Sequence, residues 1–266
     1  MCSEKDYLNK KLNRKVDNAI QRMIQREGVD RKTVDEVFDK STLFSIEKLI
    51  SNRIIDYVDF PISTGKEGNV FLAITPDGKS VALKIYRIST ATFKHMTEYI
   101  LGDPRFQSFH HSKRDIVFAW TAKEFKNLEL LRQNNITAPH PIKMINNVLA
   151  MDFIGDGRQP APLLKDVKLS DPERVFNQLI ESMHLMFTKS DLIHSDFSPF
   201  NVLYHHETPV IIDLGQAVLK DHPRASEFLH RDIHTIHKYF KRYKIKLPSE
   251  QELFDLITKK SEEESS

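Results

Sequence analysis

The chain has 266 residues, 40% of them hydrophobic and 29% charged, which is enough to bury a substantial core. Its 39 Lys and Arg nearly balance 37 Asp and Glu, so the net charge of +2 does not by itself indicate nucleic-acid binding. The single cysteine, Cys2, excludes an intrachain disulfide and a cysteine-ligated zinc site. Because no apolar run approaches the roughly 20 residues that span a bilayer, we expect a cytoplasmic protein without membrane contact or disulfide partner.

Apolar side chains in the first 55 residues recur at helical spacing, as at Leu43, Ile46 and Leu49. We therefore predict an N-terminal helical extension over 1–55. Strand-like runs follow, ISTGKEGNVFLAI and SVALKIYRI, joined by the turn sequence TPDGK, and together they predict a hairpin. The stretch 88–115 is polar and lacks a clear period, which predicts a mobile loop.

A linker with Pro160 and Pro162 separates two predicted lobes, a β-rich one over 56–155 and a mainly helical one over 156–260. In the second lobe, Asp171 and Pro172 predict the N-cap and first residue of a helix. The residues 261–266 form an acidic tail. The fold class predicted is α+β, with two lobes.

The sequence STGKEGNV at 63–70 places two glycines, two hydroxyls and a lysine between apparent strands. A loop between strands does not fit a P-loop, which joins a strand to a helix, but it can cover phosphates as a hairpin. Gly65 and Gly68 would allow the backbone to approach an anion closely. The alternative is a tight turn in which Lys66 is solvated.

In the strand VALKIY, alternation places Val81, Leu83 and Ile85 on one face and puts Ala82 and Lys84 on the other. A lysine in this position suits nucleotide phosphates, and the small alanine leaves room for a base. The alternative is an edge-strand lysine that faces solvent.

Glu124 lies four residues after Trp120 and four before Leu128, so it falls on the apolar face of a predicted helix. An unpaired carboxylate is costly there, and Lys84 is the candidate partner. The alternative is a glutamate at the rim of the core, paired with a local cation.

The sequence HSDFSPFN places Asp196 five residues before Asn201, and Asp213 follows the apolar run VII. Oxygen ligands from Asn201 and Asp213 are of the kind that Mg²⁺ prefers. Asp196 would then orient or deprotonate an attacking hydroxyl or water. The alternative, a pair of Asx turns and a helix cap, accounts for single residues but poorly for their joint spacing.

The motifs V-A-x-K, H-x-D-x-x-x-x-N and I-I-D together resemble the protein-kinase-like fold. STGKEGNV, IHSDFSPFNVLY and IIDLGQAV, in that order, resemble the RIO family of atypical serine/threonine kinases. WTAKEFKNL, MDFIG and VDEVFDKSTLFSIEKLI are similar to its Rio-one subfamily, in particular an archaeal-type member. The resemblance covers about Val34 to Tyr243.

This resemblance implies roles for individual residues. Lys84 would contact the phosphates of ATP, Glu124 would pair with Lys84, and Asp196 would be the catalytic carboxylate. Asn201 and Asp213 would hold Mg²⁺, or Mn²⁺ in its place, and Asp232 would anchor the catalytic loop from a helix. The remaining nucleotide contacts implied are Ser63, Gly65, Lys66, Gly68, Val70, Ala82, Met151 and the backbone of Asp152 and Ile154.

Two departures from ordinary protein kinases also fit the RIO pattern. Ser198 stands where a lysine is usual, and only a short connection follows Asp213, without a long activation segment or A-P-E. A peptide-docking platform is therefore missing. The resemblance implies ATP hydrolysis in late maturation of the small ribosomal subunit, with its precursor RNA and proteins as partners, and Asp213 as a residue that takes the phosphoryl group.

We also expect self-phosphorylation within 88–115, where hydroxyls occur at Ser89, Thr90, Thr92, Thr97, Ser108 and Ser112. Two other functions stay open. One is a small-molecule phosphotransferase of the aminoglycoside or choline kinase type, which shares the H-x-D and I-D motifs but lacks STGKE. The other is a nucleotide-sensing assembly factor without turnover, although all the residues for catalysis are present.

Overall fold

The computed structural model describes residues 38–88, 93–101, 103–106 and 112–259, and these form two compact units. Of the described residues, unit 1 holds 38–94, 112–122 and 141–160, and unit 2 holds 95–106, 123–140 and 161–259. The first 37 residues of the predicted helical extension and the acidic tail lie outside the described residues. Within the described ranges, no helix is both long and apolar enough to cross a membrane.

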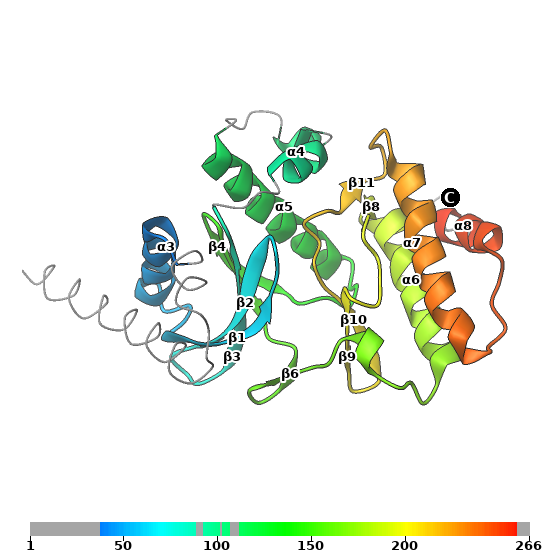
Figure 1. The fold of residues 1–266 in the computed structure, drawn as a ribbon, viewed down its shortest axis with the longest axis horizontal. Coiled ribbons are helices and arrows are strands. Elements are labelled where there is room, and N and C mark those ends of the chain that lie inside the picture. Colours follow the sequence, from blue (N-terminus) through cyan, green and yellow to red (C-terminus); the bar gives the residue numbers. More distant parts are fainter. Residues whose placement is uncertain (1–37, 89–92, 102, 107–111, 260–266) are drawn as a thin grey trace, which may run out of the picture. The chain divides into compact units, whose positions relative to one another are not determined.

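Unit 1 is built on an antiparallel sheet of five strands in the order β1-β2-β3-β5-β4. The strands are β1 (Tyr57–Thr64), β2 (Gly68–Ile74), β3 (Ser80–Tyr86), β4 (Pro141–Ile145) and β5 (Val148–Asp152). Helix α3 (Lys40–Ser51) lies beside this sheet (Figure 1). Its N-cap is Asp39, whose carboxylate accepts a hydrogen bond from the backbone of Thr42 at 2.8 Å.

One face of the sheet forms an apolar core with α3. Alternation along β3 directs Val81, Leu83 and Ile85 to this face, where Ile46 and Leu49 of α3 pack against them. Burying one such side chain contributes about 1.5–3 kcal/mol. The prediction that Val81, Leu83 and Ile85 share an apolar face is therefore confirmed, and Ala82 and Lys84 lie on the opposite face of β3.

A buried amide fixes α3 to the sheet. Asn147 donates from Nδ2 to Thr42 Oγ1 and to the carbonyl of Tyr86, both at 2.8 Å. Two short strands, β6 (Gly155–Asp156) and β7 (Gln159–Pro160), end unit 1.

Unit 2 is mainly helical, with α6 (Pro172–Lys189), α7 (Ala225–Phe240) and α8 (Glu250–Thr258). Helix α8 packs against both α6 and α7 (Figure 1). The predicted N-cap is confirmed, because the carboxylate of Asp171 accepts a hydrogen bond from the backbone of Arg174 at 3.0 Å. Short turns of 3-10 helix occur at η2 (Leu164–Asp166) and η3 (Lys241–Tyr243).

Four short strands of unit 2 form two antiparallel pairs. β9 (Val202–His205) pairs with β10 (Thr208–Ile211), and β8 (Leu192–Ile193) pairs with β11 (Val218–Leu219). Helix α5 (Lys113–Gln133) gives its residues up to Ala122 to unit 1 and those from Lys123 to unit 2.

The prediction of an irregular loop over 88–115 was wrong for much of its length. Residues 93–101 form α4 (Phe93–Leu101), 104–106 form η1 (Pro104–Phe106), and α5 begins at Lys113. In α4, Met96 and Ile100 are fully buried and four residues apart. Together with Phe93 they recur at helical spacing, but the segment spans little more than two turns, which is too short for the period to be recognised from the sequence. The rest of the loop, 89–92, 102 and 107–111, lies outside the described residues.

Candidate active site

The predicted nucleotide-contacting side chains of unit 1 converge on one sheet face. Lys84 lies opposite Val70 of β2, and Ala82 lies opposite Met151 of β5. Directly opposed residues of antiparallel strands project to the same side. Val70, Ala82, Lys84 and Met151 therefore share the face that is turned away from the α3 core.

The position of Lys84 excludes the alternative of an edge-strand lysine. β3 is central, between β2 and β5, and the side chain of Lys84 is buried. Its Nζ lies 5.0 Å from the centroid of the Tyr86 ring, within the range of a cation–π contact.

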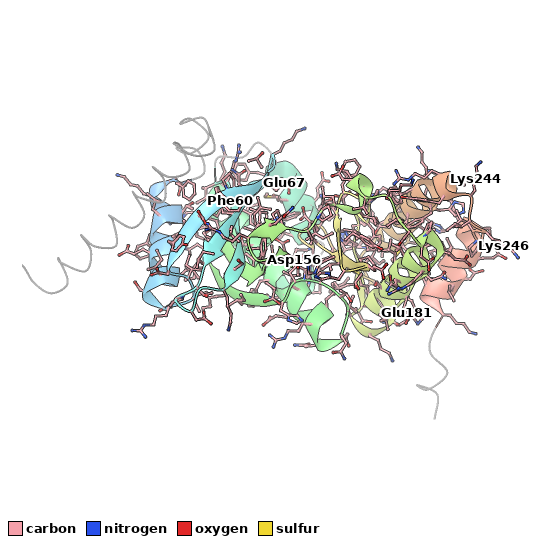
Figure 2. All side chains as sticks on the ribbon, turned by 90° about the horizontal axis from the view of Figure 1, so that it is seen from below. Phe60, Glu67, Asp156, Glu181, Lys244 and Lys246 are labelled. Carbon is pink, nitrogen blue, oxygen red and sulfur yellow. The ribbon has the colours of Figure 1, made fainter. Side chains whose placement is uncertain are left out.

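The sequence STGKEGNV forms the turn between β1 and β2, as predicted. The backbone N–H of Gly65 donates to the carbonyl of Gly68 at 2.9 Å, which closes the turn. Glu67 lies in this turn (Figure 2), and its carbonyl accepts a hydrogen bond from the backbone of Arg87 at 3.0 Å. Ser63 and Lys66 are exposed. Contact of this turn with phosphates stays a prediction.

Gly68 is required by packing. A Cβ at this position would lie 2.5 Å from the carbonyl oxygen of Ile85 and 3.1 Å from the Cα of Tyr86. Only glycine therefore permits β2 to start this close to β3.

Two further predicted positions can be placed. Glu124 on α5 is 1% exposed, so the alternative of a glutamate at the rim is wrong, while its pairing with Lys84 stays a prediction. β5 ends at Asp152, and Ile154 lies in the connection to β6. Their role at an adenine edge also stays a prediction.

In unit 2, strand pairing brings Asn201 and Asp213 to the same end of one hairpin. Asn201 comes directly before β9, and Asp213 follows β10 by two residues. Val202 pairs with Ile211, and the next N–H, that of Ile212, donates to the carbonyl of Asn201 at 3.0 Å. Two residues far apart in sequence thus become neighbours.

Asn201 is oriented by Asp196. Its Nδ2 donates to the backbone carbonyl and to the Oδ2 of Asp196, both at 2.9 Å. Both amide hydrogens are committed in this way, and no hydrogen bond among the described residues uses the amide oxygen Oδ1. An amide oxygen and carboxylates are suitable ligands for a hard cation, so the donor set fits Mg²⁺.

His194 ties the two segments together. This buried ring contacts the carbonyl of Ile212 through Nε2 at 3.0 Å and the backbone N–H of Asp196 through Nδ1 at 3.3 Å. A carbonyl can only accept and an N–H can only donate, so the contacts fit the neutral ring protonated at Nε2. His194 therefore links the backbone before Asp213 to that of Asp196.

The electrostatics of the loop favour a proton acceptor. Partial burial raises the pKa of Asp196, and the nearby carboxylate of Asp213 adds to this effect, whereas the hydrogen bond from Asn201 opposes it. A carboxylate with a raised pKa is a better general base than an ordinary one.

The predicted anchor Asp232 is confirmed. The carboxylate of Asp232 on α7 accepts from the backbone N–H groups of Ser195 at 2.8 Å and Phe197 at 2.9 Å, on either side of Asp196. The neighbouring Arg231 donates to the carbonyl of Ser195. Burial raises the pKa of Asp232 to about 6, against the opposing effect of these donors.

The sequence did not predict the side chains that hold the segment after Asp213. Lys123 donates from Nζ to the carbonyls of Gly215 at 3.1 Å and Ala217, and Asn127 donates to that of Leu214 at 2.9 Å. Lys123 and Asn127 are fully buried. Their signal was present, because both follow Trp120 at helical spacing, on the apolar stripe of α5.

A sheet with an inward lysine, together with a helical unit that brings Asp196, Asn201 and Asp213 into one loop cluster, defines the protein-kinase-like α+β fold. A model of the RIO domain matches residues 69–253, so this chain belongs to the RIO family of serine/threonine kinases. The family and the enzyme class that the motifs predicted are therefore confirmed.

Named relatives agree with this assignment. The chain is 40% identical over 221 residues to the RIO-type serine/threonine-protein kinase Rio1 of Haloferax volcanii, covering 83% of this chain and 76% of the relative. It is 38% identical to Rio1 of Methanocaldococcus jannaschii, covering 95% and 89%. With human serine/threonine-protein kinase RIO1 it shares 39% identity over 88% of this chain, but over only 42% of the human protein.

Among solved structures, the Rio2 kinase–ADP/Mg²⁺–phosphoaspartate complex from Chaetomium thermophilum is similar, with a TM-score of 0.63. The match covers 82% of this chain and 67% of the other at 23% identity. At that identity the likeness supports the fold, and the predicted fold class is confirmed.

Proposed function

We propose that this kinase binds ATP with Mg²⁺ and transfers the γ-phosphoryl group to a serine or threonine hydroxyl or to water. The orientation of Asn201 carries this proposal, because both its amide hydrogens bind Asp196, which leaves its oxygen to bind a cation at the end of the hairpin where Asp213 also lies. The Rio2 kinase crystallised with ADP and Mg²⁺ supports the use of a nucleotide and Mg²⁺ here. Mn²⁺, a similar oxygen-seeking cation, would also be accepted.

Each residue has a role in this scheme. Lys84, with its face partners Val70, Ala82 and Met151, would contact the nucleotide, and Glu124 would neutralise the amine. Asn201 and Asp213 would hold Mg²⁺, which when bound neutralises charge on the phosphates. The hydroxyl oxygen would form a bond to the γ-phosphorus as the bond to the β-phosphate oxygen breaks, and the hydroxyl proton would pass to Asp196.

The turn between β1 and β2 would cover the phosphates through its backbone and through Ser63 and Lys66. The backbone of Asp152 and Ile154 would meet the edge of the adenine. We also propose that Asp213 takes the phosphoryl group transiently: a carboxylate oxygen would bond to the γ-phosphorus as the bond to ADP breaks, and water would then cleave the acyl phosphate to release inorganic phosphate. The phosphoaspartate of the Rio2 complex suggests such a state for that protein.

We further propose that the enzyme acts in the cytoplasm on a precursor of the small ribosomal subunit and phosphorylates itself. The family resemblance supports this, and so does the short connection after Asp213, since α7 begins at Ala225 and no peptide-docking segment intervenes. Two of the candidate acceptors lie in described residues: Thr97 on α4, and Ser112, which donates to Asp115 at 2.5 Å. The others (Ser89, Thr90, Thr92 and Ser108) lie outside them. Membership of the RIO family argues against a small-molecule phosphotransferase.

The test is hydrolysis of radiolabelled ATP by the full chain with Mg²⁺, measured as phosphate release and as label on the protein. Lys84→Ala and Asp213→Ala should each lower turnover by a factor of about 10² or more. Lys79→Ala is the control, because Lys79 is an exposed turn lysine that pairs with Asp77. Parental rates in both variants would overturn the assignment, and binding of ATP without any turnover would support a nucleotide sensor instead.

A further inference from the structure

The backbone that follows Asp213 is held from α5 by two buried side chains. Lys123 Nζ binds the carbonyls of Gly215 and Ala217, and Asn127 Nδ2 binds that of Leu214. Both side chains lie on one face of α5, four residues apart, and neither is exposed to solvent. Three successive anchor points therefore fix the path of the chain immediately after Asp213.

A second layer connects these anchors to η1. Arg105 donates from Nη2 to Asn127 Oδ1 at 2.9 Å. The same guanidinium donates two hydrogen bonds to the carboxylate of Asp103, from Nε at 2.8 Å and from Nη2 at 2.5 Å. Asp103 is 3% exposed. A continuous path of hydrogen bonds thus runs from Asp103 through Arg105 and Asn127 to Leu214.

Stability alone does not explain a lysine in this place. Burial lowers the pKa of Lys123 to about 7, so the protein environment disfavours its charged form, although Asp103 and Glu124 partly offset this. An apolar side chain of similar volume is often as stabilising as a buried ionic group, or more so. What a methionine could not do is donate to the carbonyls of Gly215 and Ala217.

We propose that Lys123 and Asn127 are positioning residues for phosphoryl transfer, which hold residues 214–217 so that the Asp213 carboxylate meets Mg²⁺, and that Asp103 and Arg105 hold Asn127 in turn. This inference rests on the proposed function, in which Asp213 is a metal ligand. None of the four residues needs to touch the substrate. Their effect on the reaction passes through the backbone of Leu214, Gly215 and Ala217.

The test uses variants that remove donors with little change of shape. Lys123→Met removes the donor to Gly215 and Ala217, and Asn127→Asp places an acceptor against the carbonyl of Leu214. Arg105→Met breaks the second layer at a side chain that is 21% exposed, and it is made together with Asp103→Asn so that no buried carboxylate loses its partner; this variant is therefore expected to fold even if the buried ones do not. Arg132→Met, an exposed cation on the same helix, is the matched control.

The first measurement is the Mg²⁺ concentration that gives half-maximal turnover at saturating ATP. It should rise about tenfold in Lys123→Met and Asn127→Asp, and about threefold in the double variant Asp103→Asn/Arg105→Met, as is usual when the support of a metal ligand is removed. The second measurement is hydrogen–deuterium exchange of the ligand-free proteins. Amides of 214–217 should exchange about tenfold faster than in Arg132→Met, while amides of β3 keep the parental rate.

Folded variants with the Mg²⁺ dependence and exchange of the control would overturn the inference. If the buried variants do not fold, a double variant Asp103→Asn/Arg105→Met indistinguishable from Arg132→Met would overturn it. Failure of the proposed function gives a different result, because then the parental protein shows no Mg²⁺-dependent turnover, or Asp213→Ala leaves turnover unchanged.

Discussion

Asp232 accepts a hydrogen bond from the backbone N–H of Ser195 at 2.8 Å, and this contact fixes a strained point of the loop that carries Asp196. Ser195 has a φ of 68°, in the left-handed region that non-glycine residues rarely adopt. The second bond of Asp232, from the N–H of Phe197, grips the loop on the other side of Asp196. The position of Asp196 therefore depends on a carboxylate more than 30 residues later in the chain.

Asp232→Ala should lower turnover by about 10²-fold, because a displacement of the order of 1 Å in a catalytic group has an effect of that size. The dissociation constant for ATP measured without Mg²⁺ should change by less than about twofold, since Asp232 and the loop that it holds carry none of the residues proposed to contact the nucleotide itself. Turnover and nucleotide affinity are measured separately, with the exposed Asp221→Ala as the control. Turnover equal to that of the control, in a folded protein, would contradict the anchoring role.

A pH dependence of stability follows from the same residue. Burial raises the pKa of Asp232 from 3.8 to about 6, so the folded protein binds this proton more tightly than the unfolded chain does. The stabilisation from protonated Asp232 is fully present below pH 3.8 and is lost as the pH rises through 6.

Urea unfolding between about pH 4 and pH 7 should reveal this effect. The free energy of unfolding of the parental protein, relative to Asp232→Asn, should fall by about 2 kcal/mol over this range. Asp221→Asn should show no such trend. A difference between parental protein and Asp232→Asn that stays constant with pH would show that Asp232 keeps an ordinary pKa.

Adding a methyl group at Gly68, which ends the turn between β1 and β2, should destabilise the protein. Gly68→Ala would place Cβ 2.5 Å from the carbonyl of Ile85, so β2 must move away from β3 next to Lys84. We expect a loss of about 1–3 kcal/mol in the free energy of unfolding, and reduced turnover. Gly65→Ala, whose Cβ would meet only the carbonyl of Gly68 at 3.1 Å, should lose less. Equal losses in the two variants by urea unfolding would show that strand spacing is not limiting.

The sequence predicted those parts of the site that depend on local pattern. Alternation in VALKIY gave the face of Lys84, and the pairing of β3 with β2 and β5 confirms it. The spacing in HSDFSPFN and the apolar run before Asp213 indicated Asn201 and Asp213, and the pairing of β9 with β10 brings these two residues to the same end of a hairpin. In both cases the positions of the side chains follow from the alternation along one strand or from the spacing within one short loop.

The parts that the sequence did not predict depend on contacts between distant segments. Lys123 binds carbonyls more than 90 residues away, and helical spacing places it on the apolar stripe of α5 without indicating which groups it binds. His194 was visible in the motif, but its link to Ile212 exists only once β8 and β10 are in place. Helix α4 was missed although Phe93, Met96 and Ile100 recur at helical spacing, because nine residues span little more than two turns and polar stretches flank them on both sides.

A basic surface that follows α7 is a candidate contact for the proposed ribosomal partner. Basic side chains follow α7 at Lys241, Lys244 and Lys246, and all three are exposed (Lys244 and Lys246 are labelled in Figure 2). Close by, Arg242 stacks on the rings of Tyr239 and Tyr243, 4.0 Å and 4.7 Å from their centroids. Unstacked RNA bases can stack on aromatic rings and on arginine guanidinium planes.

If these lysines contact RNA of the small-subunit precursor, affinity should fall steeply as salt rises, because neutralised phosphates release counterions. Replacing all three with Gln should flatten the slope of log affinity against log salt by about two. Lys79→Gln is the control for a general change in charge. The measurement is binding of purified precursor particles at several salt concentrations, together with the ATPase rate.

We expect slow turnover in the free protein, poor activity on generic peptides, and a changed rate on the particle, because nothing after Asp213 positions a foreign hydroxyl. An unchanged slope in the triple variant would exclude this surface, whereas fast phosphorylation of an unrelated substrate without any response to particles would contradict the proposed partner itself.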